Sequence, residues 1–198
     1  MVKVAPLLTE NVRFCPTIRV ETFPERLTEQ NVDALVGAYD WVVDGTDSIA
    51  VKFLLNAACK RHGKFLVTAS VHRFEGQLMT IEPDGPCLQC LFPETPPEGC
   101  VGTCGETGVL GVLPLLFGTL QANEVLKGVL GYGQTLSQDA LLLDLRNGAT
   151  TKLRRDKRAG CPGCLGEWQA STIDLTWPEA RQMLDNLTLV DMRESPEF

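Results

Sequence analysis

Two pairs of cysteines constrain the fold of this chain more than any other feature. Cys87 and Cys90 have two residues between them, and so do Cys161 and Cys164. This spacing lets both sulfurs of a turn point at one ion, and four thiolates complete the tetrahedron that zinc prefers. The sequence therefore predicts one structural zinc ion with no open ligand position. The competing interpretation is a set of redox dithiols or buried cysteines, but a redox pair does not explain two matching turns.

The composition argues against several classes of protein. The chain has 198 residues, of which 44% are hydrophobic, and this is enough for one domain with a core plus the start of another. No secretory signal opens the sequence, so we expect a cytoplasmic protein whose eight cysteines are ligands or reactive thiols. The formal net charge of -7 argues against nucleic acid as a partner. The longest apolar stretch, residues 109–120, is too short to span a membrane.

The order of predicted strands and helices indicates an α/β fold. Residues 39–44 and 65–71 are short apolar runs typical of buried parallel strands, and residues 49–62 between them have a helical pattern. Together they make a βαβ unit, so we expect a Rossmann-like, doubly wound sheet. Residues 17–23 alternate as a strand does, and residues 27–36 have the pattern of a short helix.

The second half of the sequence predicts an antiparallel extension of this sheet. Residues 77–81 indicate a further strand, and residues 109–130 a long apolar helix. Residues 141–145 and 150–153 indicate two antiparallel strands around a turn that contains Asn147 and Gly148. We therefore expect the antiparallel strands on the C-terminal side of the sheet, next to the zinc site.

The domain boundaries follow from these elements. Residues 1–165 form the main domain, which the second cysteine pair closes, and residues 166–175 form a linker. Residues 176–198 begin with a capping box at Thr176 and predict a helix followed by a short strand. One helix and one strand bury too little to fold alone, so they indicate the beginning of a second domain.

Several motifs are similar to those of one known family. Across residues 15–165 the chain resembles the ubiquitin-activating-enzyme-like adenylyltransferases, of ThiF-like fold, that activate ubiquitin-like sulfur carriers for molybdopterin, thiamine or tRNA thiolation. The tail LTLVDMRESPEF is similar to the first strand of a rhodanese domain. The motifs that carry the main resemblance are VVDGTD ending at Asp47, FEGQ ending at Gln77, GPCLQCLFP, CGETGVLG beginning at Cys104, and GTLQANEVLK.

The resemblance implies a reaction and residues for it. In the family, the C-terminal carboxylate of a carrier ending in Gly-Gly attacks the α-phosphate of ATP, which gives an acyl-adenylate and pyrophosphate. Asp47 matches the catalytic aspartate, which would coordinate Mg²⁺ near the ATP, and Ser48 stands where an Asn usually lies beside the nucleotide. Considered alone, Asp47 would be a plain helix N-cap. Cys104 matches a cysteine that in some members binds the carrier covalently; otherwise it is a spare surface thiol.

One part of the family pattern is absent from the sequence. We find no Gly-rich turn of the type that cradles ATP phosphates at a helix N-terminus. We therefore expect an N-terminally incomplete adenylyltransferase that needs an N-terminal half to adenylate a carrier. Unpaired strands at 17–23 or 39–44 should seek a partner, and we expect a homodimer. The alternative is a non-catalytic, zinc-stabilised binding module that docks a carrier or a homologous subunit.

Overall fold

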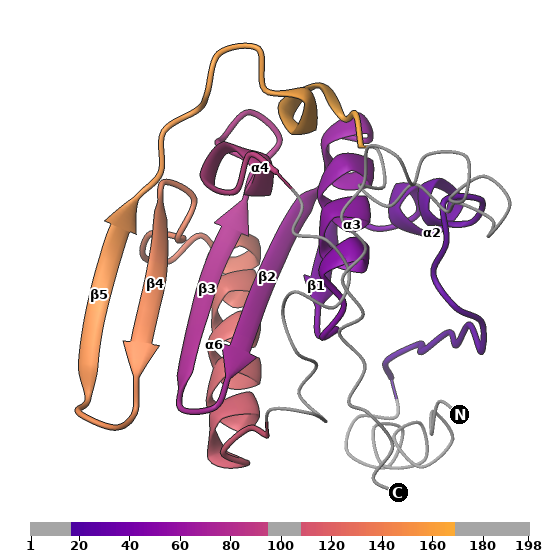
Figure 1. Cartoon of the computed structure of the whole chain (residues 1–198). Helices are drawn as coiled ribbons and strands as arrows, with labels where there is room; N and C mark the ends of the chain where they lie inside the picture. Colours follow the sequence, from indigo (N-terminus) through magenta and orange to yellow (C-terminus); the bar gives the residue numbers. More distant parts are fainter. Residues whose placement is uncertain (1–16, 95–107, 169–198) are drawn as a thin grey trace, which may run out of the picture.

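A mixed five-stranded sheet organises the chain in the computed structural model, which describes residues 17–94 and 108–168 (Figure 1). Its strands are β1 (Trp41–Asp44), β2 (Phe65–His72), β3 (Glu75–Ile81), β4 (Asp139–Asp144) and β5 (Ala149–Arg154). They lie side by side in chain order; β1 and β2 are parallel, and the other neighbours are antiparallel. The antiparallel extension that the sequence predicts is therefore confirmed.

Helices cover both faces of this sheet. They are α2 (Val32–Gly37), α3 (Ile49–Arg61), α4 (Leu88–Leu91) and α6 (Val112–Leu130), followed by the 3-10 helix η1 (Pro162–Leu165). α6 packs against β2 and β3 on one face, and α3 packs on the other face with α2 and η1 beside it (Figure 1). Consecutive residues of a strand point to opposite faces, so Leu66 joins the core around α3 and Val67 the core around α6. The doubly wound α/β fold is confirmed.

The βαβ unit from β1 through α3 to β2 has clear start and stop signals. The Ser48 hydroxyl accepts a hydrogen bond from the backbone N–H of Val51 at 3.4 Å, which caps the first turn of α3. Gly63 ends the helix with a φ of 61°, a conformation that glycine adopts without strain. The chain then enters β2, where Thr68 lies opposite Asp44 in the parallel register.

Two expectations near the start of the chain are wrong. Residues 17–23 form no strand, and three of their apolar side chains, Ile18, Val20 and Phe23, are exposed. An alternating pattern makes a strand only where a neighbour pairs its backbone, and no described strand pairs with this segment. The helix expected over residues 27–36 begins later, at Val32, because residues 28–31 form a turn.

Part of the chain lies outside the described residues. The helix and strand expected after residue 176, and with them the rhodanese resemblance, fall there. Among residues 17–94 and 108–168, no helix is both long and apolar enough to cross a membrane.

Candidate functional site

A cavity of about 800 Å³ opens where β1 and β2 end, between α3 and the start of α6. Its wall includes Asp44 and Asp47 after β1, Lys52 and Phe53 from α3, and Phe117 from α6. Open α/β sheets bind their ligands at the carboxyl ends of parallel strands, which is where this cavity lies. Its volume lies in the range of small-molecule and cofactor sites.

The structure separates the two residues that the resemblance assigned to nucleotide binding. Asp47 is exposed and contributes to the cavity wall. Ser48 is the helix cap, and its hydroxyl is already bonded to the first turn of α3. Ser48 is the N-cap of α3, so the interpretation of Asp47 as a plain N-cap is wrong.

A buried carboxylate, Asp44, lies directly behind the loop that carries Asp47. Asp44 is a buried residue with 1% exposure, and its side chain accepts four hydrogen bonds. Its Oδ1 accepts from the backbone N–H of Thr46 at 2.9 Å and from the Thr46 hydroxyl at 2.8 Å. Its Oδ2 accepts from the Lys52 ammonium and from the Thr68 hydroxyl, each at 2.7 Å. These four partners satisfy the hydrogen-bonding capacity of the buried carboxylate, and they also fix the loop.

The hydrogen bonds around Asp44 join four elements at the cavity: β1, α3, β2 and α6. The Lys52 ammonium also donates to the Ala69 carbonyl at 2.6 Å, which joins α3 to β2. From the opposite face, the Gln121 amide of α6 donates to the Asp44 carbonyl at 2.7 Å. Asp44 is part of the VVDGTD motif, but Lys52 was not identified from the sequence as a residue of the site. The available signal was a lysine one helical turn after the cap, beside an acid that ends a strand.

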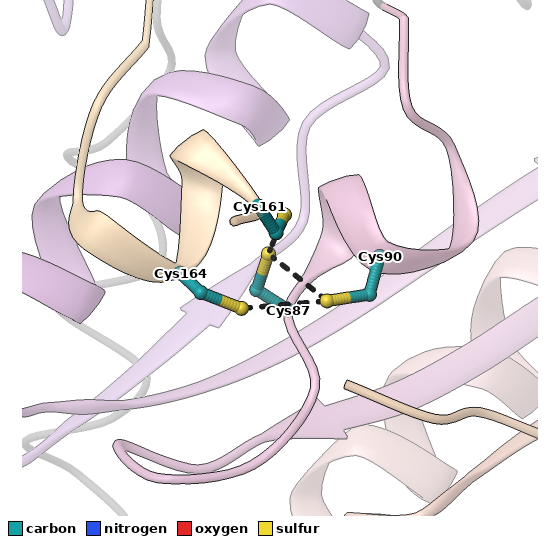
Figure 2. Close-up of side chains that lie close together, drawn as sticks. All are labelled: Cys87, Cys90, Cys161 and Cys164. Atoms are coloured by element: carbon teal, nitrogen blue, oxygen red, sulfur yellow. Dashed lines mark hydrogen bonds between the residues drawn. The ribbon is translucent and has the colours of Figure 1, made fainter. Parts of the chain in front are cut away.

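The four cysteines of the predicted zinc site lie together near the C-terminal end of α3. Figure 2 shows their sulfurs pointing toward one another, and all four lie within 4.8 Å. The sulfur of Cys87 lies 3.6 Å from the sulfur of Cys161 and 3.9 Å from the sulfur of Cys90. The sulfurs of Cys90 and Cys164 are 3.3 Å apart. A zinc tetrathiolate with bonds of about 2.3 Å has sulfurs about 3.8 Å apart. The cluster therefore fits a metal ion.

The thiols of this cluster differ in acidity without a metal. Burial raises the pKa of Cys87, and the neighbouring cysteine sulfurs raise it further. Burial also raises the pKa of Cys90. Backbone N–H groups of Arg158 and Cys87 donate to its sulfur, however, and the net result is a pKa lowered to about 7. Such N–H donors favour the thiolate, the form that binds metal.

The remaining predicted site residue, Cys104, lies outside the described residues. The structure therefore brings Asp47 to the cavity and the four other cysteines to one point, and it leaves the position of Cys104 undescribed.

Comparison with known proteins gives the sequence a consistent set of relatives. A sequence model of the ThiF family matches residues 4–163. A sulfur carrier protein adenylyltransferase from Thermus thermophilus is 40% identical over 155 residues, which are 75% of this chain and 57% of that protein. A SAMP-activating enzyme E1 from Haloferax volcanii is 39% identical over 80% of this chain and 58% of its own length. The adenylyltransferase and sulfurtransferase MOCS3 of Culex quinquefasciatus is 42% identical over 74% of this chain and 34% of its own length. The chain thus spans a third to just over half of these relatives.

Solved structures agree on the fold. The E. coli enzyme MccB with bound ATP superimposes with a TM-score of 0.65 over 82% of this chain and 50% of its own, at 14% identity. MccB in complex with N-formylated MccA gives a TM-score of 0.68 over 82% of this chain and 52% of its own, also at 14% identity. At this identity the likeness concerns the fold alone.

Proposed function

The chain belongs to the ThiF family, and from this we propose that it carries the adenylylating site of an enzyme that activates a ubiquitin-like sulfur carrier protein. The names of its relatives support this proposal, since they include a sulfur carrier protein adenylyltransferase and a SAMP-activating enzyme. The product would serve sulfur transfer in molybdopterin, thiamine or tRNA thiolation pathways.

The observation that carries the proposal is the position of Asp47 in the wall of the cavity at the ends of β1 and β2. An oxygen of the carrier carboxylate would attack the α-phosphorus of ATP there, forming an acyl-adenylate, a mixed anhydride with a new O–P bond, as pyrophosphate leaves. Mg²⁺ would neutralise phosphate charge, and Asp47 is the residue we assign to hold it. The bonds from Asp44 to Thr46 and Lys52 keep the Asp47 loop in place, so that little reorganisation is needed during the reaction.

We assign the covalent step to Cys104. Its thiolate would displace AMP from the acyl-adenylate and leave the carrier on the enzyme as a thioester. The assignment is supported by the match of CGETGVLG to the family motif.

We assign a structural zinc ion to Cys87, Cys90, Cys161 and Cys164. Zinc in such a site supplies folding energy rather than chemistry, because all four positions are filled by protein ligands. The spacing of the sulfurs supports this assignment.

We further propose that the protein is a homodimer. The support is that β1 ends the described sheet and that its residue Val43 is 50% exposed. An open strand edge favours association with another chain.

The test is to trap the product. The protein, supplemented with the part of the Thermus thermophilus relative that it does not cover, would be incubated with ATP, Mg²⁺ and a carrier ending in Gly-Gly, and the carrier analysed by mass spectrometry. We expect an AMP adduct on the intact carrier and none on a carrier that lacks its last glycine. A carrier that binds tightly without acquiring AMP under any condition would instead indicate a non-catalytic binding module.

A further inference from the structure

Two cations next to the cysteine cluster, Lys60 and Arg155, donate only to backbone carbonyls among residues 17–94 and 108–168. The Lys60 ammonium donates to three carbonyls, those of Glu82 at 2.7 Å, Pro83 at 2.9 Å and Gly85 at 2.6 Å. These bonds use all three of its protons. Within the described part of the chain, Lys60 forms no ion pair with a carboxylate.

Arg155 has the same kind of environment and is more deeply buried, with 2% exposure. Its Nη2 donates to the carbonyls of Thr80 at 2.7 Å, Leu136 at 3.0 Å and Ser137 at 2.9 Å. Its Nη1 donates to the Pro86 carbonyl at 3.3 Å. It, too, lacks a carboxylate partner among the described ion pairs. A charge removed from water in this way is costly unless an opposite charge lies nearby.

The cysteine cluster supplies the largest compensating charge for both cations, and for Arg155 the carboxylates of Asp139 and Glu82 add to it. Burial lowers the pKa of Lys60 and of Arg155. Among the groups that raise these two pKa values, the sulfur of Cys164 has the largest effect on Lys60. For Arg155 the largest effect comes from the sulfur of Cys90. Neutral thiols would give the two cations no such compensation, whereas a zinc ion with four thiolates carries a formal net charge of minus two.

Both cations also hold the segment that leads into the first cysteine turn. Between them they bind five carbonyls of residues 80–86, and Cys87 follows directly. The residue after Lys60 extends this arrangement to the second turn, because Arg61 donates to the Gly166 carbonyl at 2.6 Å. The last turn of α3 therefore lies across both halves of the cluster and fixes their separation.

We propose that Lys60 and Arg155 are the charge-balancing and positioning residues of the four-cysteine metal centre. They offset the two negative charges of the zinc tetrathiolate, and they hold residues 80–86 so that the two cysteine turns meet. This inference rests on the zinc assignment made above. It adds a role for two residues that are not ligands, and it explains why a half-buried lysine and a buried arginine are tolerated beside four thiols.

The experiment measures zinc release from the purified, zinc-loaded full chain to an excess of a chromogenic chelator. Lys60→Met removes the charge and the three bonds while keeping the length of the side chain. Loss of such outer partners lowers metal affinity about 10–100-fold, and we expect release to accelerate about 10-fold or more. Lys60→Arg keeps the charge and should restore much of the wild-type rate. Lys152→Met, on exposed β5, is the matched control and should release zinc as the wild type does.

Lys60→Gln keeps donors but no charge, and it serves in place of the Met variant if that variant does not fold. Release from both Lys60→Met and Lys60→Gln at the wild-type rate would overturn the inference. Fast release from Lys60→Arg and Lys60→Met alike would overturn the charge-balancing role. A folded wild-type protein that contains no zinc would instead overturn the zinc assignment itself, so the two failures are distinguishable.

Discussion

At the scale of single residues, the cavity depends on a buried ion pair rather than on an exposed cluster of charges. Lys52 and Asp44 have side-chain exposures of 8% and 0%. Asp44 accepts four hydrogen bonds, and Lys52 donates to Asp44 on β1 and to the Ala69 carbonyl on β2. Breaking such a pair leaves one charge without compensation, which costs far more than the pair contributes when it is intact. The pair therefore makes the loop around Asp47 sensitive to change.

Replacing Lys52 by Met should show this sensitivity. We expect Lys52→Met to lower the free energy of unfolding by about 3–5 kcal/mol, because Asp44 stays buried without its cation. Lys52→Arg is the control, since it keeps the charge and should lose less. Urea denaturation followed by circular dichroism measures both. A loss below about 1 kcal/mol, the scale of a surface pair, would show that Asp44 does not depend on Lys52.

The cysteine ligands allow a second test at this scale. Cys161→Ser should reduce the zinc content well below one ion per chain and lower the melting temperature, because a structural zinc site contributes directly to folding. Cys59→Ala is the matched control: Cys59 is also buried, but it lies in α3 outside the cluster. Its zinc content should be unchanged. Metal analysis that finds no zinc in folded wild-type protein would contradict the assignment.

The thiols should also differ in reactivity. Burial, and after it the charge of Asp44, raises the pKa of Cys59 to about 12, so almost no thiolate is present at neutral pH. We expect Cys104 to be alkylated by iodoacetamide much faster than Cys59. Mass mapping of a time course at pH 7 measures both rates in one sample. Equal rates would remove the reason to assign Cys104 a covalent role.

At the scale of elements, α6 shows how one helix is held against the sheet. Gly128 faces the indole of Trp41, which itself stacks on Phe65 with ring centroids 4.4 Å apart. A Cβ added at Gly128 would lie 2.1 Å from the Trp41 ring, whereas a Cβ at Gly118 of the same helix would meet nothing within 4 Å. The structure therefore requires a glycine at position 128, where no side chain fits, but leaves space for a side chain at position 118.

Alanine substitutions test this difference. Gly128→Ala should destabilise the protein by about 1–3 kcal/mol, because the helix and Trp41 must move apart. Gly118→Ala should instead stabilise it by up to about 1 kcal/mol through helix propensity. Thermal unfolding of the two variants side by side gives the comparison. A loss of stability in Gly118→Ala equal to that in Gly128→Ala would show that contact with Trp41 is not the cause.

The elements differ in how well the sequence predicts them. The apolar runs of β1 and β2 and the Ser48 and Gly63 signals of α3 are local, and they predict that unit correctly. Residues 17–23 have an equally good strand pattern, but a strand requires a partner, and the pattern contains no information about one. The start of α2 was missed because the Asn31 side chain accepts from the Thr28 N–H and favours a turn.

At the scale of the whole molecule, α3 connects the two parts of the candidate site. Its first turns hold Lys52 at the cavity, and its last turn holds Lys60 at the cysteine cluster. The cysteine spacing predicted the cluster, because metal ligands must converge wherever they lie in the sequence. Asp47 was identified as a residue of the cavity site only through the family resemblance. The roles of Lys60 and Arg155 could not be predicted, since each depends on carbonyls that are distant in sequence.

The most direct test of the proposed activity is carrier-dependent exchange between ATP and radiolabelled pyrophosphate. The chain would be assayed alone and together with the part of the Thermus thermophilus relative that it does not cover. We predict exchange in the supplemented sample that requires a carrier ending in Gly-Gly. Asp47→Asn should reduce it at least about 100-fold, as expected for the loss of a group that stabilises transition-state charge. No carrier-dependent exchange in either sample, or an undiminished rate with Asp47→Asn, would contradict the account.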